Sequence, residues 1–406
     1  MELALFLLLT NTIFLAGVFL LRFNKLIGLL VTIYCLVWAI TIYLLAIFSP
    51  ASIAFMTYKG IIILYAHFIC VLLASLFTFN SFHQLVNVQR IKMSSQTLYL
   101  VCLVLATIGI CMVLYTTDVW TFYIQNQLAE LRGELFEQKI TVNRYYKFIG
   151  NFVYPLAIVG PLYFFRKNKS VWVLVAVILL GGLLSFSNGG KGNLLIVVII
   201  LIGAIVYLLY QRNYVFPKVL KRAAIILSIA MLSFFYFISL TRVEANEKFS
   251  AFDSIVLINE YFSSSIPSFC QWIEINDVAY IDFNIGQTAL LREAGSIIGI
   301  SNPRTIDQQV VNIPHRFNVF TAFADSLAAF GYIGSLIYYL IIGAILGLID
   351  LIPKSDSTIF IFSTFFLFVC YSLFTDIFFY MIGSWICLSF HFLFKIEDRG
   401  KKPLIE

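Results

Sequence analysis

Cationic side chains gather at a few places in this sequence, each beside a long apolar run. The glycine-rich segment Ser187–Asn193 contains Lys191 directly after Gly190. Glycines let backbone N–H groups approach an anion closely, and a lysine adds a positive charge. The segment lacks the full spacing of a nucleotide-binding phosphate loop. It is equally typical of an anion site and of a tight turn whose lysine extends to the membrane surface.

Two arginines stand in comparable positions. Arg242 follows an apolar run, and Arg304 follows Pro303 in a turn-like stretch. A planar guanidinium can bind a phosphate through two parallel hydrogen bonds. The alternative for Arg242 is an anchor at the membrane interface, where arginine is common.

The third group of cationic residues directly precedes another apolar run. His315 and Arg316 are followed by Asn318, Asp325 and then Phe330–Gly334. Histidine has an ordinary pKa of about 6.5 and often serves as a general base, although a loop histidine without a catalytic task is the alternative. Cations of this kind can hold a diphosphate and neutralise the charge that develops on it as it leaves. The three groups together therefore predict a site for an anionic, diphosphate-containing substrate.

The composition requires a bilayer as the main solvent. Of the 406 residues, 61% are hydrophobic and only 12% are charged. A water-soluble protein carries about 25% charged residues, so half the usual charge cannot cover a water-facing surface. This excludes a cytosolic enzyme, a nucleic-acid-binding protein and a disordered chain.

Eleven apolar runs are long enough to cross a bilayer, which requires about 20 residues at a rise of about 1.5 Å each. They are 2–21, 26–48, 60–79, 97–116, 148–165, 171–187, 194–210, 223–241, 328–349, 357–376 and 377–394. The predicted fold is an all-α polytopic membrane protein in which residues 1–406 form a single integral-membrane domain. Two long connections, 117–147 and 242–327, are predicted to form a small cap on the outer face.

Basic residues predict the orientation. With the N-terminus outside, the inner segments hold sixteen of the 27 Lys and Arg residues and only five of the 21 Asp and Glu residues. Cytoplasmic segments carry an excess of lysine and arginine. We therefore expect the N-terminus outside and the C-terminus in the cytoplasm.

The predicted spans contain few ionisable groups, the main exceptions being His67 and His391. Ion-coupled carriers need such groups inside the membrane, so this pattern disfavours them. We expect His67 to be a hydrogen-bonded interior residue. The seven cysteines form neither a CxxC pair nor a Cys/His cluster, so we predict no disulfide framework, metal or cofactor.

In order and spacing, these segments resemble the O-antigen polymerase family, the oligosaccharide repeat-unit polymerases of bacterial surface polysaccharides. The resemblance covers the span layout and the late outer loop, with local signals at Ser187–Gly192, around Arg242, and at Glu260–Tyr261, Asn318–Thr321 and Phe330–Gly334. Two positions depart from the family pattern. Lys191 stands where arginine is more frequent, and Ala329 stands where an aspartate is common, with Asp325 one helical turn earlier.

The resemblance implies a GT-C-like architecture and a glycosyltransferase activity at the periplasmic side of the bacterial inner membrane. Such an enzyme transfers a growing glycan from one undecaprenyl diphosphate to a new lipid-linked repeat unit. Donor and acceptor are then both undecaprenyl-diphosphate-linked oligosaccharides in the lipid bilayer. A chain-length regulator protein is compatible as a further partner, and no nucleic acid is involved.

The resemblance also suggests roles for individual residues. The catalytic group would comprise His315, which deprotonates the acceptor hydroxyl, with Arg242 and Arg316 on the donor diphosphate. The substrate-binding residues would be Lys191, Gly190, Arg304, Asn318 and Tyr261. Of these, Lys191 and Arg304 would contact the diphosphate, while Asn318 and Tyr261 would position sugars.

Three other functions remain open from the sequence. An O-antigen ligase would use the same chemistry with a lipid A core as acceptor. A polysaccharide flippase would move the lipid without forming a bond, although its outer loops are typically short. A noncatalytic membrane scaffold is the third.

Overall fold

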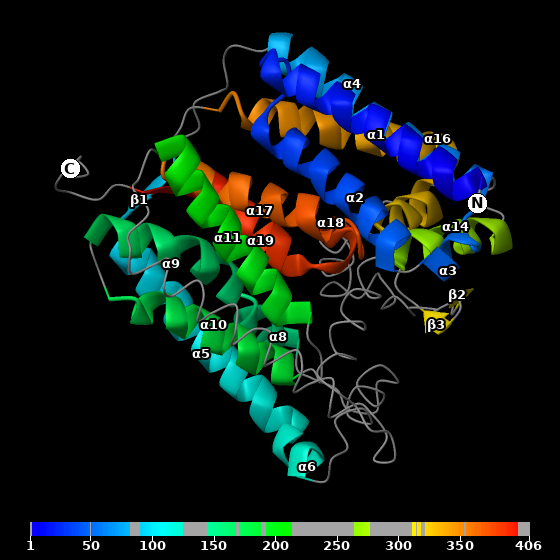
Figure 1. Ribbon diagram of the computed structural model, residues 1–406. Helices are drawn as coiled ribbons and strands as arrows, with labels where there is room; N and C mark the ends of the chain where they lie inside the picture. Colours follow the sequence, from blue (N-terminus) through cyan, green and yellow to red (C-terminus); the bar gives the residue numbers. More distant parts are fainter. Residues whose placement is uncertain are drawn as a thin grey trace. The chain divides into compact units, whose positions relative to one another are not determined.

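The computed structural model describes residues 2–48, 50–81, 90–124, 144–167, 170–187, 192–212, 264–276, 311–313, 315–317, 321–352 and 355–396. These residues form apolar helices and four strands of three residues each (Figure 1). The chain divides into two compact units. The first contains Met1–Val86, Ile255–Ile352 and Phe368–Met381, and the second contains Asn87–Ser254, Pro353–Leu367 and Ile382–Glu406.

The first unit is built on four long apolar helices: α1 (Glu2–Phe23), α2 (Leu29–Phe48), α4 (Tyr58–Ser81) and α16 (Ala322–Ile349). Its shorter helices are α3 (Pro50–Ile53), α14 (Ser265–Ile275) and α18 (Ile377–Tyr380). Helix α4 lies alongside α16, and α1 lies against α2 (Figure 1). Large apolar side chains of α1, including Leu5, Leu9 and Ile13, are exposed. Such a surface suits contact with lipid rather than water.

Small residues bring α4 and α16 close together. A Cβ on Gly343 would collide with the backbone carbonyl oxygen of Val71, so this crossing requires glycine. The Thr78 hydroxyl donates a hydrogen bond to the Ala344 carbonyl oxygen across the same interface (3.2 Å). Close backbone approach through small residues is how membrane helices gain packing energy without a hydrophobic driving force.

Helix α16 is bent at Gly331. This residue has φ 70° and ψ −175°, which breaks the helical conformation between two helical segments. The left-handed φ region is strained for residues with a Cβ and open to glycine. The hydroxyls of Ser326 and Ser335 lie 2.6 Å apart across the bend. In a straight helix, nine residues would separate them by about 13.5 Å along the axis.

The second unit contains α5 (Ser95–Thr117), α6 (Val119–Ile124), α8 (Arg144–Gly150), α9 (Val153–Lys167), α10 (Trp172–Ser187), α11 (Gly192–Arg212), α19 (Ile382–Leu393) and the first part of α17 (Thr358–Tyr371). Strands β1 (Ile91–Met93) and β4 (Phe394–Ile396) pair in parallel. The Ser94 hydroxyl caps α5 by accepting a hydrogen bond from the Thr97 N–H (3.0 Å). Arg166 forms an ion pair with buried Asp356.

The chain is a multi-pass membrane protein by helix length and hydropathy. Among the described residues, seven helical segments are long and apolar enough to cross a membrane: Leu5–Phe23, Leu29–Ile47, Tyr58–Thr78, Ser95–Thr117, Tyr145–Arg166, Gly192–Leu209 and Ala322–Ile349. All seven coincide with predicted runs. Helices α10, α17 and α19 are apolar but shorter.

The last two predicted spans were too long. The run 357–376 contains a helix that ends at Tyr371, and the run 377–394 is divided into α18 and α19 at Met381. Hydropathy missed this break because Phe, Met and Ile continue through it. The predicted span 223–241 lies outside the described residues. Of the predicted cap, the structure describes α6, the start of α8, α14 and a β-hairpin, so the purely α-helical prediction omitted short strands. It also describes the first turns of α16, which begins at Ala322, so the predicted outer loop 242–327 extended too far.

Replacement of Gly331 by alanine should destabilise the protein by about 1–3 kcal/mol, because a Cβ is strained at this φ. The measurement is the thermal unfolding midpoint in detergent. Gly182→Ala is the matched control, because its Cβ would meet nothing within 4 Å in the middle of α10. An equal midpoint for G331A and G182A would contradict the proposed need for glycine at the bend.

Candidate functional site

Most of the predicted site residues lie outside the described residues. These are Lys191, Gly190, Arg242, Arg304, Asn318 and Tyr261. His315 and Arg316 are described at the level of the backbone only, in strand β3 (His315–Phe317). The structure therefore gives the backbone position of these two residues in strand β3. That the cationic side chains gather at one site stays a prediction.

Strand β3 forms an antiparallel hairpin with β2 (Val311–Ile313), in which Ile313 pairs with His315 and Asn312 pairs with Arg316. Strand β2 contacts α14. Helix α14 is in turn held to the segment before α4, because the Gln271 side chain donates to the Phe55 carbonyl oxygen (2.8 Å). Strand β3 ends four residues before Thr321, the residue that precedes α16. The hairpin formed by β2 and β3 therefore belongs to the first unit, which also contains the start of α16.

A buried carboxylate holds the start of α16 in place. Asp325 lies in the first turn of α16, and its Oδ2 accepts hydrogen bonds from the Thr375 hydroxyl (2.7 Å) and the Asp376 N–H (2.8 Å). The Ala322 N–H donates to the Ser372 carbonyl oxygen (2.8 Å). These bonds join α16 to the connection 372–376 that follows α17.

A second carboxylate lies at the end of that connection. Asp376 is fully buried, and its Oδ1 caps α18 by accepting from the Phe378 N–H (2.8 Å). Its Oδ2 accepts a hydrogen bond from the Tyr338 hydroxyl (2.7 Å), on the α16 segment beyond the bend. Asp376 and Asp325 are therefore neighbours within one polar cluster, called here the carboxyl pair.

The environment of Asp376 disfavours negative charge. Asp376 lies outside the apolar helices, and burial raises its pKa from an ordinary 3.8 to about 7. The nearby Asp325 carboxylate raises this pKa further, whereas hydrogen bonds from Tyr338 and the Phe378 N–H lower it. Desolvation and a like charge both favour the protonated form. A carboxyl group of this kind can take up or release a proton near neutral pH, as a general base must.

Aromatic side chains surround the connection 372–376 and the residues of α16 that form the carboxyl pair. The Trp38 indole N–H donates to the Ser372 hydroxyl (3.0 Å). The Trp38 ring stacks on Phe323, with ring centroids 4.9 Å apart. Phe330 contacts both Tyr338 (5.8 Å) and Phe379 (5.5 Å). These rings limit the access of water and so maintain the low dielectric that shifts the pKa of Asp376.

His67 is part of a second polar chain in the same unit. Its Nδ1 lies 2.7 Å from the Ile63 carbonyl oxygen, and its Nε2 lies 2.7 Å from the Ser335 hydroxyl. Because a carbonyl only accepts, the neutral ring carries its proton on Nδ1 and accepts from Ser335 at Nε2. The prediction that His67 is a hydrogen-bonded interior residue is confirmed.

Sequence reasoning missed Asp376 and Tyr338. The apolar pattern predicts spans that are nearly free of ionisable groups, yet Asp376 occupies the end of the predicted span 357–376. A single carboxylate between two apolar runs was the available signal, since an unpaired charge there is costly and usually functional. Tyr338 could not be found in this way, because tyrosine is common in the apolar helices of this chain.

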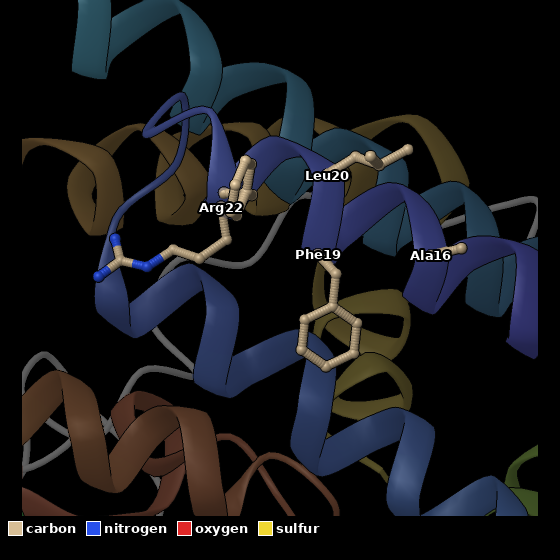
Figure 2. Close-up of a pocket in the computed structure, with 5 residues that line it drawn as sticks. Ala16, Phe19, Leu20 and Arg22 are labelled. Carbon is tan, nitrogen blue, oxygen red and sulfur yellow. The ribbon is translucent and has the colours of Figure 1, made fainter.

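Two other features do not form the site. Figure 2 shows an open pocket at the C-terminal end of α1, lined by Ala16, Phe19, Leu20, Arg22 and Phe23. Arg22 is its one charged residue, and Arg22 Nη1 donates to the Ile27 carbonyl oxygen (2.9 Å). Cys270 is buried in α14, and burial raises the pKa of its thiol to about 12. Such a thiol is a packing residue rather than a nucleophile.

Comparison of the chain with protein-family models, with curated proteins and with solved structures gives no match.

The stability of the protein should fall as the pH rises from about 4 to about 7. Folded Asp376 binds a proton that the unfolded chain has already lost, and this preference disappears above its folded pKa of about 7. The full effect is on the order of 4 kcal/mol. Asp376→Asn keeps the hydrogen bond from Tyr338 and should flatten this dependence.

The measurement is the thermal midpoint of the wild type and of D376N as a function of pH. Asp118→Asn is the control, because Asp118 is exposed and its left-handed φ of 45° suits asparagine. Parallel pH profiles for the wild type and D376N would show that Asp376 does not titrate in this range.

Proposed function

We propose that this chain is a membrane-embedded glycosyltransferase that polymerises undecaprenyl-diphosphate-linked oligosaccharide repeat units. In this proposal it has eleven spans and a GT-C-like architecture, with the N-terminus outside and the C-terminus in the cytoplasm of a bacterial inner membrane. The active site faces the periplasm. The observation that carries the proposal is the carboxyl pair, whose member Asp325 lies in the first turn of α16, nine residues after Arg316 in strand β3. This arrangement brings acid–base chemistry and cationic residues into one short stretch of chain.

The proposed reaction needs charge stabilisation and alignment rather than a metal. The acceptor hydroxyl attacks the anomeric carbon of the donor, and the bond from that carbon to the diphosphate oxygen breaks. The electron pair leaves on the diphosphate, where Arg242 and Arg316 would neutralise it, assisted by Lys191 and Arg304. Backbone N–H at Gly190 would contact the same anion. Asn318 and Tyr261 would orient the sugars, and His315 is the base predicted from the sequence.

Loss of a cation on the diphosphate should abolish long glycans. Arg316→Ala removes a charge-assisted hydrogen bond worth about 1.5–3 kcal/mol, which corresponds to roughly a tenfold to hundredfold loss in rate. The measurement is the glycan ladder from cells that express each variant at normal levels. Lys147→Ala, which removes an exposed cation from α8, is the matched control and should keep the ladder.

Arg242→Ala and His315→Ala extend the same test. If R316A, R242A and H315A all keep long glycans at normal expression, the proposed site is wrong.

The proposed orientation can be tested separately. Alkaline phosphatase, which is active only outside the cytoplasm, should be active when fused after Lys59 and inactive when fused after Lys25. Lys25 lies just after α1 and before α2, and Lys59 lies beyond the other end of α2, in the first turn of α4. The reverse pattern of activity would place the carboxyl pair on the cytoplasmic side and would exclude a periplasmic active site.

The carboxyl pair also favours a second candidate, a flippase that couples lipid movement to protons. Buried carboxylates are the usual proton carriers of membrane transporters. Purified protein with lipid-linked repeat units separates the two: the polymerase joins repeats, whereas the flippase moves them across vesicles without forming a bond. Deletion in cells separates the remaining alternative, since a polymerase mutant leaves one repeat on the lipid A core and a ligase mutant leaves none.

A further inference from the structure

Arg90, which lies just before strand β1 in the second unit, has few interaction partners. Its Nη2 is 3.5 Å from Nε2 of His391. Its Nε is buried and has no hydrogen-bond partner among the described residues, and no described carboxylate forms an ion pair with it. A buried donor on a permanently charged guanidinium is costly unless an anion pairs with it. The surroundings of Arg90 therefore indicate an anion that the described residues do not supply.

His391, the residue that faces Arg90, supplies no negative charge. It is buried in the last turn of α19, and its Nδ1 lies 2.9 Å from the Ser357 carbonyl oxygen. Because a carbonyl only accepts, Nδ1 carries the proton, and Nε2 is left as an acceptor for Arg90. The acid next to Ser357 is Asp356, which forms its ion pair with Arg166. These groups therefore hold the Arg90 guanidinium in place without neutralising its charge.

Two lysines on the ribbon formed by β1 and β4 add positive charge close to Arg90. Lys92 is directly opposite Lys395 in the parallel pairing, and both residues are exposed. Residues paired in this way point to the same face of the ribbon. Both lysines have other interactions in the chain, so they strengthen the local positive potential while Arg90 defines the site. The fold thus collects three cations from two distant segments of the sequence.

The ribbon lies at the end of a helix long enough to cross the membrane. Strand β1 is followed within two residues by the spanning-length segment Ser95–Thr117. Exposed apolar side chains flank the cations, namely Ile91 on β1 and Phe392 and Leu393 at the end of α19. Lysine and arginine beside apolar side chains at the end of a span are typical of the headgroup level of a bilayer. The anion best suited to Arg90 is therefore one that carries acyl chains.

We propose that Arg90 binds the phosphate group of an anionic phospholipid, with Lys92 and Lys395 increasing the attraction. A phospholipid phosphate has two non-bridging oxygens, which match the parallel N–H groups of a guanidinium. One such oxygen provides the acceptor that the Arg90 Nε–H lacks. Arg90 is half-buried, so a headgroup can approach it from the lipid.

This lipid site does not depend on the proposed glycosyltransferase activity. In the proposed orientation, the ribbon faces the cytoplasm, where the membrane leaflet has a negative surface potential. A cationic site at that leaflet selects lipids by the net charge of the headgroup. It therefore favours phosphatidylglycerol over phosphatidylcholine, whose phosphate is compensated by its own ammonium group.

Lipid binding to the purified full-length protein tests the proposal. The protein is titrated with phosphatidylglycerol and, separately, with phosphatidylcholine, and bound lipid is measured by native mass spectrometry. The wild type should bind phosphatidylglycerol more tightly, and this preference should shrink as the ionic strength rises. Arg90→Gln should weaken phosphatidylglycerol binding by about tenfold or more, because a charge-assisted hydrogen bond is lost. Its binding of phosphatidylcholine should not change.

Three further variants make the test specific. Lys147→Gln removes an exposed cation from α8 in the same unit and should keep the wild-type affinity. Lys395→Gln should weaken phosphatidylglycerol binding by about two- to fivefold, as expected for one cation near an anionic lipid. Arg90→Lys keeps the charge but loses the parallel donors, so its affinity should lie between those of the wild type and R90Q. Thermal midpoints without added lipid show whether each variant is folded.

The proposal is overturned if the wild type binds the two lipids equally. It is also overturned if R90Q, or R90K should R90Q not fold, binds phosphatidylglycerol as tightly as the wild type. Inorganic phosphate in excess should leave the lipid bound. If phosphate instead displaces the lipid and raises the thermal midpoint to the same extent, the site takes a free anion and the assignment to a lipid is wrong. Selective lipid binding without any glycan transfer would contradict only the proposed function.

Discussion

The hydrogen bond from the Asp376 N–H to the Asp325 carboxylate is the interaction on which the candidate site depends. Inside a membrane protein, a polar group that loses water must find its partner within the protein. Asp325 meets part of this requirement through the connection 372–376, which lies against the first turn of α16 and donates two hydrogen bonds to its carboxylate. The same requirement places Asp376 beside Tyr338. One satisfied carboxylate therefore positions a second one and builds an acid–base cluster at the end of apolar helices.

The bend at Gly331 makes this arrangement compatible with close helix packing. Beyond the bend, α16 follows α4 at a distance that Gly343 and Gly347 permit, because a Cβ at either position would collide with α4. Before the bend, the first turns of α16 leave that direction and present Asp325 to the connection after α17. Ser326 and Ser335 close the inside of the bend, and Ser335 also bonds His67 of α4. The bend is thus held by these hydrogen bonds and by aromatic contacts of Phe323 and Phe330.

The function proposed for the protein draws on two kinds of support that differ in strength. The bilayer environment follows from composition and from seven apolar helices of spanning length. The proposed chemistry is supported by the carboxyl pair and by the His315–Arg316 strand that precedes α16. In the proposal, the cations predicted at Lys191, Arg242 and Arg304 would bind the phosphates. A buried carboxyl group can serve a transferase as a base and a transporter as a coupling site, which is why bond formation is the decisive assay.

Sequence alone predicted the seven spanning-length helices found among the described residues, because about 20 consecutive apolar residues have few other stable environments. It also indicated His67 as an interior residue. It failed at the C-terminal spans, where apolar residues continue through the break at Met381 and hydropathy contains no signal for a turn. Only the tertiary structure decided which polar groups meet. Asp325 and Asp376 are 51 positions apart, and their contact depends on the bend at Gly331 and on where α17 ends, neither of which a local pattern encodes.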